Sequence, residues 1–139
     1  MEDIISRLQK EHSIRIGTFT KEMYDVITES IPSLSEKLIP GGGIFLLSGR
    51  LKHLKEHEKD FIDFNKYLNS LPEIIECPDY ITASPKNHSI SFIKVFYQNV
   101  NVAVRLSERG ELTIRTMYPI TTAQLQHYIS QGLAWKWSI

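Results

Sequence analysis

Residues 89–119 read SISFIKVFYQNVNVAVRLSERGELTIRTMYP and alternate between apolar and polar side chains over most of their length. This alternation predicts three strands, near residues 89–97, 100–106 and 111–118. Turns are expected at Gln98-Asn99 and at residues 108–110. Short connections of this kind join antiparallel neighbours, so the three strands are expected to form a meander.

The register of this meander follows from gathering the branched aliphatic side chains on one face. Pairing Val95 with Val102 and Val104 with Ile114 achieves this, and the resulting face is expected to be the core. The same register adds seven residues to that face: Ile93, Tyr97, Val100, Leu106, Leu112, Thr116 and Tyr118.

The opposite face then mixes cationic and aromatic side chains. Its members are Phe92, Lys94, Phe96, Asn101, Ala103, Arg105, Thr113, Arg115 and Met117. Cations offset the charge that grows on phosphate oxygens in a transition state, and nucleic-acid bases stack on flat rings. This pattern predicts phosphate binding by Lys94, Arg105 and Arg115, and base stacking by Phe92 and Phe96. The alternative is that the N-terminal helices bury this face and that acidic residues pair with its cations.

Helical patterns surround the meander. They predict helices over residues 2–10, 20–31 and 121–131, and one helix or two abutting helices over residues 50–70. Thr20 and Thr121 or Thr122 are suitable N-caps for the second and the last of these helices. A flexible joint at residues 39–43 leads into a short strand at 44–48.

These elements predict an α+β fold. N-terminal helices are expected on one face of a three- to four-stranded antiparallel sheet, followed by a C-terminal helix. The length of 139 residues suits a single domain. Within it we expect a helical extension over residues 1–40 and a core over residues 44–139.

Composition indicates which classes of protein this chain does not resemble, such as membrane and secreted proteins. No apolar run is long enough to span a bilayer and the first residues lack a signal peptide, so we expect a cytoplasmic protein without a membrane partner. Cys77 is the only cysteine, which excludes an intrachain disulfide and a cysteine-based zinc site. The formal net charge is +0, so an RNA site would have to be a local cluster of cations.

Two histidines stand four residues apart in Arg50-Leu51-Lys52-His53-Leu54-Lys55-Glu56-His57. On a helix, His53 and His57 would project from one face, and imidazoles titrate near neutral pH, which suits an acid and base pair. The spacing also suits two zinc ligands, although HLKEH lacks the glutamate that follows the first histidine in HExxH proteases. The third interpretation is two surface histidines on a charged helix.

Five segments together resemble a phage-associated branch of the nucleases that share the barnase, EndoU, colicin and RelE-like fold. They are GRLKHLKEHEKDF (49–61), LPEIIECPDYI (71–81), SISFIKV (89–95), VNVAVRLS (100–107) and LTIRTMYP (112–119). Each segment is weakly specific alone, and their order is the more specific signal. Residues 1–40 lie outside the resemblance.

The resemblance implies a metal-independent endoribonuclease of toxin or phage origin that cleaves RNA through the 2'-hydroxyl and needs no cofactor. It points to His53 or His57 as acid or base, to Lys94 and Arg115 as phosphate ligands, and to the strand of Thr116 and Tyr118. An immunity or antitoxin protein is a further expected partner.

One conflict and two rival functions remain open at this stage. The register assigned above places Thr116 and Tyr118 on the core face, whereas the resemblance favours a place in the site for at least one of them. The first rival is a non-catalytic module that binds protein or RNA. The second is a zinc hydrolase that uses His53 and His57.

Overall fold

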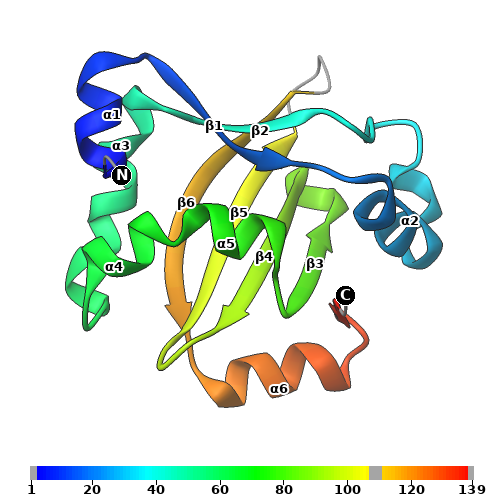
Figure 1. Ribbon diagram of the computed structural model, residues 1–139. Helices are drawn as coiled ribbons and strands as arrows, with labels where there is room; N and C mark the ends of the chain where they lie inside the picture. Colours follow the sequence, from blue (N-terminus) through cyan, green and yellow to red (C-terminus); the bar gives the residue numbers. More distant parts are fainter. Residues whose placement is uncertain (1–2, 107–110, 138–139) are drawn as a thin grey trace.

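The computed structural model describes residues 3–106 and 111–137 (Figure 1). The turn expected at residues 108–110 lies outside the described residues. The described strands form one seven-stranded sheet with the order β1-β2-β6-β5-β4-β3-β7. The strands are β1 (Ser13–Thr18), β2 (Gly43–Leu47), β3 (Tyr80–Ser84), β4 (Ser89–Val95), β5 (Asn99–Leu106), β6 (Leu112–Ile120) and β7 (Ala134–Lys136).

The helices are mostly short. The α-helices are α1 (Ile4–Lys10), α2 (Lys21–Ser30), α3 (Leu51–Leu54), α4 (Phe64–Asn69), α5 (Leu71–Glu76) and α6 (Thr122–Ser130). The 3-10 helices are η1 (Pro32–Leu34), η2 (Ser48–Arg50), η3 (Lys55–Asp60) and η4 (Pro85–Asn87). Thr20 and Thr121 act as N-caps as expected, and Gln124 completes a capping box with Thr121.

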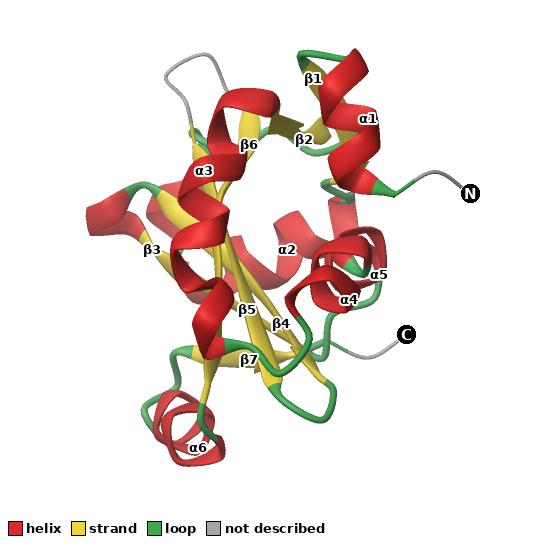
Figure 2. Ribbon diagram, turned by 90° about the vertical axis from the view of Figure 1, so that its left-hand side faces the viewer, coloured by secondary structure: helices red, strands yellow, loops and turns green. Residues whose placement is uncertain are grey.

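One face of the sheet forms the main hydrophobic core. The buried side chains of β4, β5 and β6 on this face are Ile90, Phe92, Val100, Val102, Val104, Leu106, Leu112, Ile114 and Met117. Helices α4 and α5 lie on this side (Figures 1 and 2). Gly17 of β1 permits close packing of α5, since a Cβ at this position would lie 2.8 Å from Cγ2 of Ile75.

The predicted register between β4 and β5 is wrong. Phe92, rather than Val95, pairs with Val102, and the connection is the three residues 96–98 instead of a two-residue turn. The shift of three positions is odd, so it exchanges the two faces of β4. As a result Phe92 and Lys94 face the main core side, Ile93 faces the other side, and Tyr97 is 88% exposed.

The register between β5 and β6 is predicted correctly as far as Ile114 and then changes. Val104 pairs with Ile114, as expected, but Ala103 pairs with Thr116, so Arg115 is an extra residue in β6. This β-bulge reverses the facing of every later residue of the strand. Met117 therefore lies in the core, and Thr116 and Tyr118 lie on the opposite face, contrary to the prediction.

The remaining predictions concern the fold class, the size of the sheet, the helices and Cys77. The α+β class is confirmed, but the described sheet is larger than predicted because β1, β2, β3 and β7 extend the meander on both sides. Residues 50–70, expected to form one helix or two abutting helices, are divided into α3, η3 and α4, because Phe61 is extended and Asp63 caps a new helix. Cys77 is a half-buried thiol without a disulfide partner. Among the described helices, none is both long and apolar enough to cross a membrane.

The corrected register makes a prediction about stability. Phe92 is 0% exposed in the core, so Phe92→Ala should lower the free energy of unfolding by about 3–5 kcal/mol in urea denaturation. Tyr97→Ala should change it by less than about 0.5 kcal/mol, because this ring is exposed. A larger effect of Tyr97→Ala than of Phe92→Ala would support the register predicted from the sequence instead.

Candidate functional site

The second face of the sheet is polar over most of its width. Two rows of paired positions cross β6, β5, β4 and β3 on this face. They are Thr113, Arg105, Ser89 and Ser84, and then Thr116, Ala103, Ser91 and Thr82. These two rows contain no aspartate or glutamate. In the described part of the chain, α6 lies at one end of this face, while α4 and α5 lie on the other side (Figure 2).

A third row marks the border between this polar surface and a small second core. Tyr118, Asn101, Ile93 and Tyr80 are paired in this row. Ile93 packs with Ile120 and with Leu125 of α6, and Tyr80, Tyr118 and Tyr128 cover this cluster. The helix α6 therefore closes one end of the face.

The bulge at Arg115 is held by a side chain from a neighbouring segment. Strand β2 pairs with β6 only at Leu112 and Thr113, so beyond this point β6 lacks a strand partner on that side. The segment of η2 and α3 contacts β6 there instead. Nη2 of Arg50 donates a hydrogen bond of 2.8 Å to the carbonyl oxygen of Arg115. Arg50 thus satisfies a backbone acceptor that the ladder leaves unpaired.

His57 lies against Tyr118 at the border of the polar surface. Their ring centroids are 5.7 Å apart and the rings are inclined by 47°. Nδ1 of His57 is 3.3 Å from Oδ2 of Asp60. A carboxylate can only accept, so Nδ1 carries the proton in this contact and Nε2 of a neutral imidazole is left as a base. The arrangement orients an imidazole beside a phenol.

Tyr118 is half-buried, and this affects its acidity. Burial raises the pKa of the Tyr118 hydroxyl above its ordinary value, and Tyr128 contributes in the same direction. The phenol therefore remains protonated at neutral pH and is available as a proton donor.

Arg105 on this face and Arg115 at the bulge contact no carboxylate in the described part of the chain. Among the described residues, no ion pair or side-chain hydrogen bond engages the guanidinium groups of Arg105 or Arg115, and both residues are exposed. Two such cations next to a row of hydroxyl groups suit an anionic ligand. The structure thus brings Arg105, Thr116 and Tyr118 to one face, with Arg115 at the bulge and His57 at the border.

Four other predicted site residues lie elsewhere or are engaged differently. Phe92 is in the core, and the ring of Phe96 contacts that of Tyr67, with centroids 5.4 Å apart. Nζ of Lys94 donates to the carbonyl oxygen of Cys77 at 2.7 Å, on the main core side. His53 is exposed, with Nδ1 3.3 Å from Oε1 of Glu56. The predicted row of Lys94, Ala103 and Arg115 is not formed.

Sequence reasoning missed three contributors. Arg50 and Asp60 contact Arg115 and His57, and no local sequence signal marks the first of these contacts because Arg50 and Arg115 are 65 positions apart. Asn101 is only 3% exposed and its Nδ2 is 3.5 Å from Oγ of Ser91. An asparagine among the valines of β5 was the available signal for a buried polar position.

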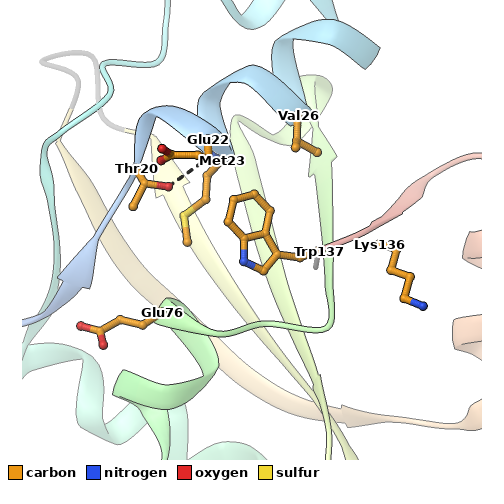
Figure 3. Close-up of a pocket in the computed structure, with 7 residues that line it drawn as sticks. All are labelled: Thr20, Glu22, Met23, Val26, Glu76, Lys136 and Trp137. Carbon is orange, nitrogen blue, oxygen red and sulfur yellow. Dashed lines mark hydrogen bonds between the residues drawn. The ribbon is translucent and has the colours of Figure 1, made fainter. Parts of the chain in front are cut away.

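A separate hollow lies between α2 and the segment of residues 136–137 (Figure 3). Its volume is about 540 Å³, and it is lined by Thr20, Glu22, Met23, Val26, Glu76, Lys136 and Trp137. None of the predicted site residues lines it. In the described ranges, no three histidine, cysteine, aspartate or glutamate side chains are grouped so that they could hold a metal ion.

Comparison with known proteins identifies a family. A family model described as phage-Barnase-EndoU-ColicinE5/D-RelE like nuclease3 matches residues 21–127. The chain belongs to this phage nuclease family. The match includes β2 to β6, His57 and the Arg115 bulge, and it confirms the resemblance seen in the sequence. It also includes α2 and the residues up to 40, so the expectation that all of residues 1–40 lie outside the resemblance is wrong for residues 21–40. No curated protein and no solved structure matches the chain. Membership in the phage nuclease family supports nuclease activity and a nucleic-acid substrate.

The burial of Tyr118 predicts a pH dependence of stability. A phenol whose pKa is raised on folding stabilises the fold below its unfolded pKa of about 10, and this stabilisation is lost as pH rises through the folded pKa. Between pH 8 and 11, Tyr118→Phe should therefore lose less unfolding free energy than the wild type in urea denaturation. Tyr97→Phe, at an exposed position, should follow the wild-type curve. Parallel curves for all three proteins would contradict the raised pKa.

Proposed function

We propose that this nuclease is a metal-independent endoribonuclease that cleaves RNA by transesterification at the 2'-hydroxyl. The proposal is carried by one observation. The bulge at Arg115 puts Thr116 and Tyr118 on the same polar face as Arg105, at the border where His57 lies against Tyr118.

The proposed chemistry needs one base and one acid. Nε2 of His57, oriented through Nδ1 by Asp60, takes the proton of the 2'-hydroxyl. The 2'-oxygen attacks phosphorus, and the bond from phosphorus to the 5'-oxygen breaks. The protonated phenol of Tyr118 delivers a proton to the departing 5'-oxygen. The products are a 2',3'-cyclic phosphate and a 5'-hydroxyl end, and the two proton transfers balance.

Arg105 and Arg115 bind the phosphate and offset its negative charge. Both guanidinium groups are exposed and neither is engaged by a carboxylate among the described residues, so they need not break an ion pair in order to bind. Cations next to the reacting phosphate stabilise charge that develops in the transition state. The hydroxyl of Thr116, paired across from Ala103, is a neutral hydrogen-bond donor to the same group.

The histidine assigned to the reaction is His57 rather than His53. The His57 ring contacts a residue of the sheet face, whereas the contact recorded for His53 is with Glu56 on its own segment.

RNA cleavage in excess EDTA tests the reaction type. The purified protein should cut mixed single-stranded RNA and leave cyclic phosphate ends, and it should leave DNA of the same sequence intact because DNA lacks the 2'-hydroxyl. Intact RNA at high protein concentration would refute the proposal. Cleavage that requires added zinc would favour a metal hydrolase, and RNA binding without cleavage would favour a binding module.

Substitutions test the residues. His57→Ala and Arg115→Ala should each reduce kcat/KM for RNA by about 10²-fold or more, the effect expected when an acid-base group or an electrostatic contact is removed. His12→Ala and Arg7→Ala are matched controls, because both residues belong to the α1 region and not to the polar face. Wild-type rates in both site variants would place the active site elsewhere.

A further inference from the structure

The polar face continues beyond β6 onto the strands β2 and β1. Phe45 of β2 pairs with Thr113 of β6 on one side and with Arg15 of β1 on the other. Ile44 and Leu46, which flank Phe45, are buried in the main core, so Phe45 points to the same side as Thr113 and Arg105. An arginine and a half-buried aromatic ring therefore extend the first polar row.

The ring of Phe45 lies back over its own strand. A Cβ at Gly43 would be 2.8 Å from both Cε2 and Cζ of Phe45, and 3.3 Å from Cζ of Arg15. Only glycine leaves space for this arrangement. Nη2 of Arg15 donates a hydrogen bond of 2.7 Å to Oγ1 of Thr18, which holds the guanidinium beside the ring. The ring and the cation are thus held in place before any ligand binds.

We propose that Phe45 and Arg15 form a stacking subsite for one unpaired RNA base next to the phosphate held by Arg105 and Arg115. The inference rests on the proposed ribonuclease function and adds a substrate class to it, single-stranded RNA. Aromatic rings with adjacent guanidinium groups bind bases of any sequence, because every base presents a π face.

Stacking on Phe45 accounts for the preference for a single strand. The backbones at Phe45 and Arg105 are two strand spacings apart, about 10 Å, which leaves room for a base at one position and a phosphate at the other. A base inside a duplex has both of its faces covered by neighbouring bases, so a base that lies on the Phe45 ring has to be unstacked. Unstacked bases of single strands are the usual targets of aromatic side chains in RNA-binding proteins.

The surroundings favour a nucleotide over an apolar protein partner. The row from Arg15 through Phe45 and Thr113 to Arg105 contains two cations, one ring and no carboxylate. A single ring between cations matches one base and its phosphates. Strand β1 precedes the matched residues 21–127, so the contribution of Arg15 is a property of this chain beyond the family match.

The test measures binding and cleavage separately. Binding uses a fluorescent single-stranded RNA with 2'-O-methyl groups, which cannot be cleaved, and cleavage uses the unmodified strand. Phe45→Ala should weaken binding by about tenfold and raise KM to a similar extent, with kcat within about twofold of the wild type. Phe45→Trp should restore binding. Binding of duplex RNA should not change in either variant.

Two glycine variants provide a matched comparison. Gly43→Ala should lift the ring of Phe45 and weaken binding of the single strand, whereas Gly42→Ala should not, because its Cβ would meet only the carbonyl oxygen of Ile39 at 3.7 Å. Urea denaturation of each variant confirms that it is folded.

The outcomes separate the two proposals. If the wild type fails to cut RNA, the proposed function is wrong. If the wild type cuts RNA and folded Phe45→Ala binds the single strand as tightly as the wild type, the stacking subsite is wrong. Loss of binding that Phe45→Trp does not restore would also overturn stacking, since it would assign a structural role to the phenyl ring.

Discussion

The hydrogen bond from Arg50 to the carbonyl oxygen of Arg115 links the fold to the candidate site. It lies where β6 has lost β2 as a partner and gains one extra residue. A bulge leaves backbone groups outside the ladder, and such groups need another hydrogen-bond partner. Because Arg50 supplies the donor, the strand continues past the bulge with its faces exchanged. Thr116 and Tyr118 then join Arg105, while Met117 enters the core.

The same exchange accounts for the different character of the two sheet faces. The main core face carries large aliphatic side chains under α4 and α5, and it provides most of the apolar burial. The second face has small hydroxyl side chains in its first two rows, and α6 covers the third. Apolar burial on the second face is confined to the small core under α6, which leaves the two polar rows available for ligand contacts.

Local signals in the sequence predicted part of this arrangement. The α+β class, the caps at Thr20 and Thr121 and the pairing of Val104 with Ile114 followed from periodicity and side-chain chemistry. The register of β4 could not be predicted in this way, because residues 96–98 contain no glycine or proline to mark the loop. The bulge at Arg115 also lacked a signal, since its partner Arg50 is 65 positions away in the chain. Both errors are register shifts by an odd number of residues. They therefore assign side chains to the wrong face of the sheet, while the order of β4, β5 and β6 stays as predicted.

Electrostatic attraction between this protein and RNA has to come from local groups of cations. With a formal net charge of +0, long-range attraction cannot concentrate RNA at the surface. Arg15 and Arg105 instead project from the second face, whose two polar rows contain no acidic residue, and Arg115 is exposed at the bulge beside it. Each phosphate contact releases counterions, so a few such contacts confer only a moderate salt dependence. Affinity in the proposed complex then depends on the hydroxyl rows and on stacking at Phe45, both of which act only after the strand has reached the sheet.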